Sequence, residues 1–370
     1  MKVDWIVAGA GFTGATFAER LAANGAQVLV VDTRPHIGGN AYDEPDDNGL
    51  LRHVYGPHIF HTNSEKVWTY LNRFSDWRPY FHRVRAVVDG REVPIPINLD
   101  TIEALFPHGI AQRYIAALTE RFRYSERVPI LKLMRETEGP LQELATYVYD
   151  KVFRNYTLKQ WDLTPEALSP SVTARVPILV SRDDRYFQDR WQAMPANGYT
   201  ALFRRMLERP GIRVMLRTSL EEVRPLFPDA KVVYTGPIDA YFGHRFGALP
   251  YRSLRFSWCT EPVEQAQAVG TVNYPEEHDF TRITEVKHLT GQRGPVTALV
   301  AEYPQAYQPG VNEPYYPIPR DETQALYNQY AELARAERNV VFCGRLADYK
   351  YYNMDQAVGA ALASFRNEQC

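Results

Sequence analysis

The chain has 370 residues, 45% of them hydrophobic and 23% charged, so it can bury a large core and divide into two or three domains. Its formal net charge of −2 argues against general attraction to nucleic acid or to an anionic membrane, so any anion must be bound by locally placed arginines. There is no membrane-spanning apolar run, no secretory signal pattern, and no cysteine spacing that predicts disulfides or a metal site. We therefore expect a cytoplasmic globular protein.

The first 32 residues contain a glycine motif in the setting that dinucleotide binding requires. An apolar strand pattern leads into Gly9-x-Gly11-x-x-Gly14, and a helix pattern follows it. The first glycine permits the turn, the second lets the backbone approach a pyrophosphate, and the third lets helix and strand pack closely. The next strand ends at Asp32, whose carboxylate can accept hydrogen bonds from ribose hydroxyls. We predict a Rossmann-like fold; a glycine-rich turn in another α/β protein is the alternative.

A glycine pair after the second strand favours FAD over NAD. Gly38 and Gly39 let the chain pass close to a bound dinucleotide. The arrangement resembles the second signature of flavoproteins of the glutathione reductase and amine oxidase type. No second G-x-G-x-x-G follows a strand downstream, so we expect FAD and no separate NAD(P) domain.

Two histidines stand close together at His58-x-x-His61. The spacing is compatible with a metal, but no cysteine spacing or carboxylate cluster completes a ligand set. We therefore predict no metal site and place these histidines beside a flavin or its substrate. Ser64 then begins a helix as its N-cap.

The middle of the chain predicts a hairpin and a helical insert. Alternating apolar positions flank Asp89-Gly90, which predicts a hairpin over 84–97, and two prolines mark its second strand as an edge. Residues 100–156 are largely helical in pattern, so we expect a separate helical insert there.

A segment broken by prolines follows the helical insert. Residues 163–177 are polar and interrupted by proline, and they include Arg175. A segment of this kind beside a binding region is a candidate lid. The alternative is a solvent-exposed linker with an ordinary surface arginine.

The last part of the chain returns to the dinucleotide fold and adds a second sheet. Strand patterns after residue 251 have no long helices between them, so we expect them to pair antiparallel. The predicted elements are a helix at 200–208; strands at 212–216, 231–236, 254–259, 271–274, 282–288 and 297–303; a helix at 321–336; a last parallel strand at 339–345; and a final helix capped by Asp355.

These elements place the chain in the α/β class, as a Rossmann-like FAD-binding domain with a helical-bundle insert and an antiparallel β-sheet domain. The discontinuous FAD-binding domain is expected at 1–80, 193–245 and 337–370. The helical bundle, with the start of the mobile loop, is expected at 98–172, and the sheet domain that binds substrate at 81–97, 173–192 and 246–336.

Five motifs resemble the bacterial UDP-galactopyranose mutase family and stand in its order over nearly the whole chain. They occupy residues 9–14, 37–42, 55–62, 157–161 and 344–356. The first two are shared with many flavoproteins, and the other three are much narrower. One departure is Asn353, which stands where the family has an acidic residue, so no carboxylate role is assigned there.

The resemblance implies an isomerase that interconverts UDP-galactopyranose and UDP-galactofuranose for cell-surface glycans, with no net redox change. It implies that FAD acts in its reduced form, with N5 as a covalent nucleophile toward the sugar while UDP leaves. A reductant such as NAD(P)H or a flavin reductase is needed, and we expect a homo-oligomer. The rivals are an FAD-dependent oxidase or dehydrogenase of the amine oxidase type, which would oxidise its substrate, and a nucleotide-sugar or flavin-binding regulatory protein without turnover.

The resemblance also assigns site residues. Arginines can stabilise a departing diphosphate, and the catalytic residues it implies are Arg175, Arg282 and His61. The substrate contacts it implies are His82, Phe153, Tyr156, Thr157, Trp161, Tyr186, Asn273, Tyr316 and Tyr351. The cofactor contacts it implies are Gly9, Gly11, Phe12, Thr13, Gly14, Asp32, Gly39, Asn40, His58, Ile59, Arg345, Met354 and Asp355. Each aromatic residue is alternatively plain core, and Glu302 lies either near the sugar hydroxyls or on a strand surface.

Overall fold

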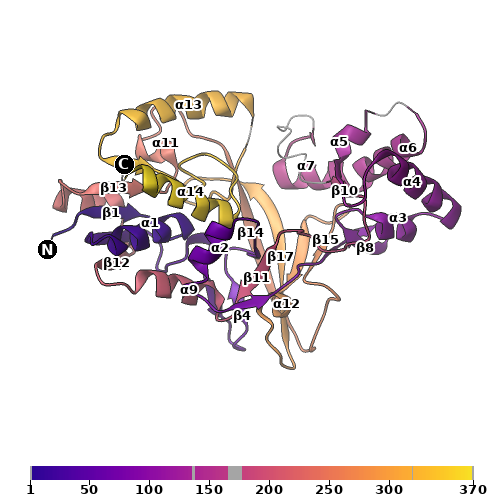
Figure 1. Ribbon diagram of the computed structural model, residues 1–370, viewed down its shortest axis with the longest axis horizontal. Helices are drawn as coiled ribbons and strands as arrows, with labels where there is room; N and C mark the ends of the chain where they lie inside the picture. The colour runs from indigo at the N-terminus through magenta and orange to yellow at the C-terminus, as the bar shows by residue number, and fades with distance from the viewer. Residues whose placement is uncertain (1, 136–137, 166–176, 319, 369–370) are drawn as a thin grey trace. The chain divides into compact units, whose positions relative to one another are not determined.

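The computed structural model describes residues 2–135, 138–165, 177–318 and 320–368. The chain forms two compact units (Figure 1): unit 1 contains residues 1–80, 189–251 and 321–370, and unit 2 contains 81–188 and 252–320. Arg175 and most of the predicted lid lie outside the described residues. The finer division into three domains stays a prediction.

The central sheet of unit 1 is parallel and has the order β12-β2-β1-β13-β19. Its strands are β1 (Trp5–Ala8), β2 (Val28–Asp32), β12 (Ile212–Leu216), β13 (Lys231–Tyr234) and β19 (Val340–Phe342). β1 and β2 are almost entirely buried, as expected for parallel strands covered on both faces. The predicted parallel strands are confirmed, but β19 is shorter than the predicted 339–345 because the backbone turns at Gly344, where φ is +113°.

Helices cover this sheet, and α1 packs against both α9 and α14 (Figure 1). The unit 1 helices are α1 (Phe12–Ala23), α2 (Glu65–Leu71), α9 (Gly198–Leu207), α10 (Leu220–Val223), α11 (Ile238–Tyr241), α13 (Asp321–Ala336) and α14 (Met354–Asn367), with 3₁₀ turns at Gly39–Ala41 and Arg224–Leu226. Two small sheets complete the unit: β3 (Asp43–Pro45) with β4 (Leu51–His53), and β5 (Phe60–Thr62), β11 (Trp191–Pro195) and β6 (Trp77–Pro79) in the order β5-β11-β6. No helix in the described ranges is long and apolar enough to cross a bilayer.

The two predicted helix caps had different outcomes. Ser64 caps α2 as expected, since its hydroxyl accepts a hydrogen bond from the Val67 N–H. The prediction that Asp355 caps the final helix is wrong. Asn353 is the N-cap residue of α14, and its N–H donates to the Gln356 side chain at 2.9 Å. The Asp355 carboxylate instead accepts a hydrogen bond from the Thr62 hydroxyl at 2.8 Å, which joins α14 to β5.

Unit 2 contains a seven-stranded sheet in the order β18-β14-β17-β16-β15-β7-β8. Its strands are β7 (Val84–Val88), β8 (Arg91–Ile95), β14 (Tyr251–Glu261), β15 (Thr271–Asn273), β16 (Arg282–Glu285), β17 (Thr297–Ala306) and β18 (Tyr316–Pro317). The hairpin is confirmed with β8 at the edge, and antiparallel pairing is confirmed for β14, β17, β16 and β15.

Two features of this sheet were not predicted. β15 and β7 pair parallel, because a long stretch of chain separates these neighbours in sequence and brings β15 back in the same direction. The strand predicted over 282–288 ends at Glu285, where α12 (Val286–Thr290) begins. Glu285 is the N-cap residue of α12, and its buried carboxylate accepts hydrogen bonds from the N–H groups of Ala266 and Gln267.

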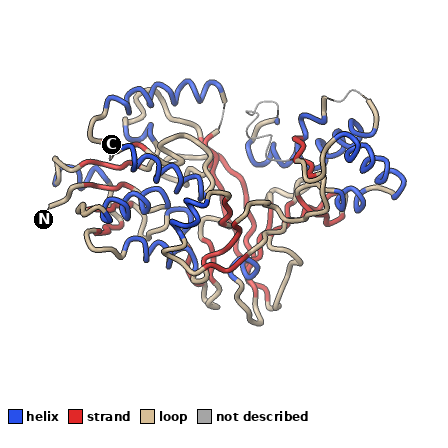
Figure 2. The backbone as a smooth tube through the Cα atoms, viewed as in Figure 1, coloured by secondary structure: helices blue, strands red, loops and turns tan. Residues whose placement is uncertain are grey.

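The predicted helical stretch of unit 2 is largely helical (Figure 2). It contains α3 (Leu99–Leu105), α4 (His108–Arg121), α5 (Ile130–Leu133), α6 (Pro140–Val148), a π-helical turn at Tyr149–Arg154 and α7 (Asn155–Trp161). The sequence did not predict β9 (Arg127–Pro129), which interrupts this stretch and pairs antiparallel with β10 (Pro177–Leu179). A core of buried side chains joins these helices to β7 and β8.

Candidate active site

The glycines of unit 1 form a cradle that larger residues would fill. Gly9 has φ +110°, and a β-carbon there would lie 2.0 Å from the Thr235 hydroxyl. A β-carbon on Gly14 would lie 1.8 Å from the Gly9 carbonyl oxygen. Gly11 and Gly39 approach so closely that a β-carbon on Gly39 would lie 3.0 Å from the Gly11 Cα. The two glycine motifs therefore meet through bare backbone, as close approach to a dinucleotide requires.

The N-terminus of α1 begins in this cradle. Gly11 is its N-cap residue and makes no side-chain cap. The N–H groups of Phe12, Thr13 and Gly14 belong to the first turn, where an α-helix offers no internal acceptor. Such N–H groups and the positive end of the helix dipole suit a pyrophosphate.

Asp32 stands at the end of β2 and is held by backbone groups. One carboxylate oxygen accepts a hydrogen bond from the Ala10 N–H at 2.8 Å, and the other accepts one from the Arg34 N–H at 2.9 Å. An ionised carboxylate has about four lone-pair positions, so acceptor capacity remains for ribose hydroxyls. The Arg34 guanidinium donates to the Asn40 side chain at 2.9 Å. This bond holds the segment that contains Gly38 and Gly39 close to the end of β2. The residues present therefore fit an adenine dinucleotide.

The turn from His53 to His58 holds the first histidine of the motif. The His58 N–H donates to Nδ1 of His53 at 3.0 Å, and the His58 carbonyl accepts from the Tyr199 hydroxyl at 3.1 Å. Nδ1 of His58 lies 2.7 Å from the Gly56 carbonyl, so we assign its ring hydrogen to Nδ1 and leave Nε2 as an acceptor. Burial lowers the pKa of His53 to about 4 and that of His58 to about 3, so both rings are neutral near pH 7. Ile59 leads from this turn into β5.

We expect His53→Asn to weaken the pH dependence of stability, because asparagine keeps an acceptor at the δ position without a titrating ring. His53 is 2% exposed, and its folded pKa of about 4 lies below its ordinary value of 6.5. Below pH 6.5 His53 is protonated in the unfolded chain but stays neutral in the folded protein. The free energy of unfolding therefore falls as the pH falls toward 4. Between pH 7 and pH 5 the wild-type protein should lose about 2 kcal/mol more unfolding free energy than the variant. Urea unfolding at both pH values measures this, and equal losses would contradict the assignment.

The C-terminal motif meets the N-terminal one inside unit 1. A β-carbon on Gly344 would lie 3.0 Å from the Thr13 hydroxyl, so Gly344 and the start of α1 are in close contact. Arg345 donates through Nε to the Tyr352 carbonyl at 3.1 Å, and its guanidinium lies 5.3 Å from the ring centre of Tyr351. Met354 begins α14 directly afterwards.

His61 has a partner that the sequence analysis missed. Its Nδ1 lies 3.0 Å from a carboxylate oxygen of Asp189, and the Asn63 side-chain amide donates to the other oxygen at 2.8 Å. Asp189 comes 128 positions later, so no local pattern identifies it. The described part of the chain contains no group of three or more histidine, cysteine, aspartate or glutamate residues that could hold a metal ion.

In unit 2, strand register places five residues in one row across the sheet. Ala86 is opposite Asn273, Asn273 is opposite Arg282, Arg282 is opposite Glu302, and Glu302 is opposite Phe256. Directly opposed residues project from the same face of a sheet. The strand pairing therefore brings two predicted residues, Asn273 and Arg282, together with Glu302.

Arg282 and Glu302 form an ion pair in which the carboxylate is buried. Nε of Arg282 lies 3.0 Å from Oε1 of Glu302; the Glu302 side chain is 2% exposed and that of Arg282 is 29% exposed. Burial works against the charged guanidinium, but the charge of Glu302 and the nearby Tyr156, Tyr316 and Tyr186 keep the pKa of Arg282 well above its ordinary value. Burial also raises the pKa of Glu302, and Arg282 opposes this rise. The surface alternative for Glu302 is wrong, because the side chain lies inside the unit.

The Arg282 site contains polar groups without protein partners. Within the described ranges, Nε of the Arg282 guanidinium is buried and makes no hydrogen bond of good geometry, although it lies 3.0 Å from Oε1 of Glu302. The side-chain oxygen of Asn273 is buried and likewise finds no donor among the residues described. A cationic side chain beside a buried acceptor that lacks a donor suits a ligand that carries both an anionic group and hydroxyl groups.

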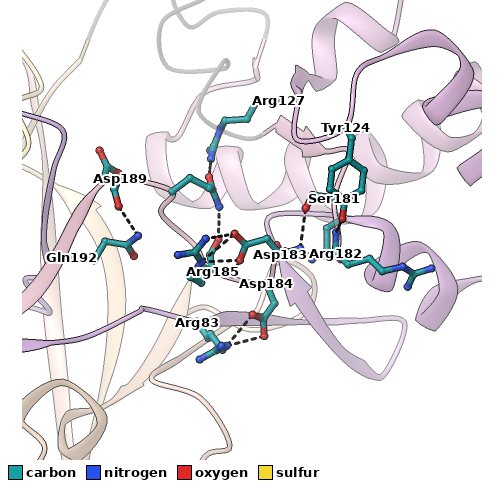
Figure 3. A network of polar contacts seen from close by, with 12 residues as sticks. Arg83, Tyr124, Arg127, Ser181, Arg182, Asp183, Asp184, Arg185, Asp189 and Gln192 are labelled. Atoms are coloured by element: carbon teal, nitrogen blue, oxygen red, sulfur yellow. Dashed lines mark hydrogen bonds and ion pairs between the residues drawn. The ribbon is translucent and has the colours of Figure 1, made fainter.

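Tyr186 is held in place by its own polar segment. Its N–H donates to the His82 carbonyl at 2.8 Å, and the two rings lie 6.0 Å apart in a T-shaped contact. The preceding residue, Arg185, donates to both oxygens of Asp183, with a shortest distance of 2.6 Å (Figure 3). These bonds place Tyr186 and His82 together, whereas the sequence analysis assigned them without recognising the ion pair that orders the segment.

The remaining predicted substrate residues lie on α7, on the π-helical turn before it and on β18. Tyr156, Thr157 and Trp161 belong to α7, and the Trp161 ring lies 6.0 Å from that of Tyr316 on β18. Phe153 belongs to the π-helical turn and lies in the hydrophobic core of unit 2. The structure therefore groups most of these aromatics around the sheet, while Phe153 packs as core.

Comparison with known proteins identifies the family. Residues 151–351 match the model of the UDP-galactopyranose mutase family, and residues 7–74 match that of an NAD(P)-binding Rossmann-like domain. The chain is 37% identical to a probable UDP-galactopyranose mutase of Klebsiella pneumoniae, over 96% of this chain and 92% of that protein. It is 33% identical to a dTDP-fucopyranose mutase of Escherichia coli, over 96% of both chains.

A solved structure has the same fold. A crystal structure of reduced UDP-galactopyranose mutase superimposes with a TM-score of 0.72 and 15% identity, covering 100% of this chain and 96% of the other. At that identity the match concerns the fold alone. The family model and the full-length relatives carry the classification: the chain belongs to the UDP-galactopyranose mutase family.

Proposed function

We propose that this protein interconverts UDP-galactopyranose and UDP-galactofuranose with reduced FAD. The observation that carries the proposal is the Arg282 site of unit 2, where a permanently charged guanidinium lies opposite Asn273, whose buried side-chain oxygen has no hydrogen bond within the described ranges, and near three tyrosines. Membership of the mutase family favours this reaction over the oxidase alternative, which shares only the glycine motifs and the fold.

Arg282 would bind the diphosphate of the substrate. Its terminal N–H groups can donate two parallel hydrogen bonds to phosphate oxygens, and each bond to a charged group contributes about 1.5–3 kcal/mol. The same bonds strengthen when UDP departs and its terminal phosphate gains negative charge, which lowers the barrier to leaving. The Glu302 carboxylate lies 3.0 Å from Nε of this guanidinium and would orient the side chain.

Other side chains of unit 2 would bind the rest of the nucleotide sugar. The Asn273 oxygen can accept a hydrogen bond from a sugar hydroxyl, which would relieve an otherwise unpaired buried acceptor. The hydroxyls of Tyr156, Tyr186 and Tyr316 would donate to the diphosphate. Arg175 would add a second cation from the candidate lid at 163–177.

The glycine cradle and Asp32 of unit 1 would hold FAD by its pyrophosphate and ribose, and His58 and Arg345 would lie near the flavin. Reduced FAD supplies the nucleophile for the anomeric carbon, the flavin N5, when it is bound. The neutral His58 ring, with its hydrogen on Nδ1, offers only an acceptor at Nε2. A reductant such as NAD(P)H or a flavin reductase would keep the cofactor active.

We expect the dithionite-reduced protein, kept anaerobic, to convert UDP-galactofuranose into UDP-galactopyranose. The oxidised protein should be almost inactive, because the nucleophile exists only in the reduced cofactor. Chromatography of the nucleotide sugars measures both rates. Equal rates in the two redox states would contradict the nucleophilic role, and an oxidised sugar product would instead favour an oxidase.

A second candidate substrate is dTDP-fucopyranose, because one full-length relative is named for it. Fucose is a 6-deoxygalactose, so this substrate lacks one sugar hydroxyl, and its nucleotide differs by a base methyl and a missing ribose hydroxyl. The same assay with both nucleotide sugars decides between them through the ratio of their kcat/KM values.

A further inference from the structure

Two basic side chains donate hydrogen bonds to main-chain carbonyl groups and so join the last turn of α7 to the sheet. Nζ of Lys159 donates to the Tyr274 carbonyl at 2.7 Å. Nε of Arg252 donates to the Gln160 carbonyl at 3.2 Å. Both bonds join α7 to the sheet of unit 2, and neither residue has a role in the site described above.

Neither cation is placed for strong charge pairing. The Arg252 side chain is only 9% exposed, and its nearest carboxylate, that of Asp162, lies 3.9 Å away on a side chain that is 81% exposed. Lys159 is half-buried, and its one hydrogen bond within the described ranges is the bond to Tyr274. Burial lowers the pKa of both residues, while Asp279 and Glu276 near Lys159 and Asp162 near Arg252 oppose this shift. Each cation therefore has a main-chain carbonyl as its hydrogen-bond partner within the described ranges.

The helix end explains why cations serve here. The last carbonyls of an α-helix have no internal partner and carry the negative end of the helix dipole, so a cation is favourable beside them. Arg252 binds one of these carbonyls, that of Gln160. Lys159 lies in the last turn, where its own positive charge is also favourable.

We call the Lys159–Tyr274 and Arg252–Gln160 hydrogen bonds the two anchors of α7. They flank the strands that carry Arg282 and Glu302. The sheet order is β14-β17-β16-β15, with Arg252 on β14, Glu302 on β17, Arg282 on β16, and Tyr274 directly after β15. α7 contacts β17 between the anchors. The helix therefore lies across the strands that carry the ion pair and is tied down on both sides.

The anchors also adjoin other site residues. Tyr274 follows Asn273, which is opposite Arg282 in the sheet. The Arg252 carbonyl accepts the N–H of Tyr315, the neighbour of Tyr316. A shift of either anchor would thus move α7 relative to side chains that the proposed reaction uses.

We propose that Lys159 and Arg252 are positioning residues that hold α7 across the sheet, so that Tyr156 and Trp161 are placed for the nucleotide beside Arg282. The inference rests on the proposed function, because it concerns the nucleotide site of that reaction. It assigns a role to two basic residues, one inside the 157–161 motif and one on the facing strand.

The test measures UDP binding by calorimetry, without turnover, together with KM and kcat for UDP-galactopyranose. Lys159→Met removes the bond to Tyr274, and we expect UDP to bind on the order of tenfold more weakly, with KM raised more than kcat falls. Arg252→Gln should weaken UDP binding in the same direction. Lys159→Arg keeps a cationic donor and should restore UDP binding to near the wild-type value.

Lys287→Met is the matched control. Lys287 also donates only to carbonyls in the described part of the chain, those of Glu264, Gly294 and Val296 at 2.7, 2.6 and 3.1 Å, but it does so from α12. Its replacement should lower the thermal midpoint while UDP binds as tightly as to the wild type. A purely structural role for Lys159 would produce that same pattern.

The wild-type measurement separates the two proposals. If the wild type binds no UDP and converts no UDP-galactopyranose, the proposed function fails, and the inference fails with it. If the wild type binds UDP and folded Lys159→Met and Arg252→Gln bind it equally well, only the inference is overturned. If Lys159→Met does not fold, Arg252→Gln alone decides by the same comparison.

Discussion

Replacing Arg282 with alanine is expected to lower kcat/KM for the nucleotide sugar by about 10²–10⁴-fold while FAD stays bound. Two hydrogen bonds from the terminal guanidinium nitrogens to the diphosphate would be lost, and both strengthen as UDP leaves. The buried Glu302 would also lose its ion-pair partner, so its charge would be uncompensated. Anaerobic steady-state kinetics of the reduced protein, with flavin absorbance as the check on cofactor content, measure the effect.

Arg255→Ala is the matched control for this prediction. Arg255 is an exposed arginine on β14, and it is opposite Tyr303 and so projects from the other face of the same sheet. Its guanidinium lies 4.0 Å from the Tyr303 ring centre, and its loss should change kcat/KM by less than about twofold. Near-normal turnover by Arg282→Ala would refute the diphosphate assignment. Arg175→Ala should resemble Arg282→Ala if the second cation acts as the family resemblance implies.

Replacing Gly14 with alanine is expected to abolish FAD binding, even where the protein still folds. The added β-carbon would lie 1.8 Å from the Gly9 carbonyl oxygen and 3.1 Å from a methyl group of Val7. The Gly9 carbonyl can move away from this β-carbon only if α1 separates from β1. The glycine cradle proposed to bind the pyrophosphate lies between these two elements. The ratio of flavin to protein absorbance after purification should fall to near zero.

Gly359→Ala provides the control for Gly14→Ala. Both glycines lie inside helices of unit 1, but a β-carbon on Gly359 would make only an ordinary contact of 3.7 Å with Val67. Alanine is favoured over glycine in a helix by about 0.5–1 kcal/mol, so this variant should keep its flavin and become slightly more stable. Full flavin content in Gly14→Ala would show that the close packing is not required for the cofactor.

Local signals in the sequence predicted the elements whose geometry depends on neighbouring residues. The G-x-G-x-x-G spacing predicted the turn between β1 and α1, since only glycine tolerates the positive φ at Gly9 and the contact at Gly14. Asp89-Gly90 predicted the hairpin of β7 and β8, since both residues have positive φ. Ser64 predicted the start of α2 through a hydrogen bond spanning three residues.

The sequence missed features where contacts distant in sequence decide the outcome. Nothing near β15 indicates that its neighbour is β7 and that the two run parallel, because the partner strand lies far back in the chain. β9 is a short strand that depends on pairing with β10, about fifty positions later. Asp355 has the chemistry of a helix cap but bonds Thr62, since folding brings β5 to the start of α14.

The amino-acid sequence alone determined the dinucleotide cradle, because its glycines and Asp32 act through backbone geometry within some thirty residues. The family resemblance named Arg282 and the tyrosines as candidates, but no sequence pattern showed how they meet. Only the tertiary structure decided that Asn273, Arg282 and Glu302 form one row and that Glu302 is buried. It also decided that hydrogen bonds of Lys159 and Arg252 join α7 to the sheet. The physical reason is strand register, which aligns residues from separate parts of the chain on one face of the sheet.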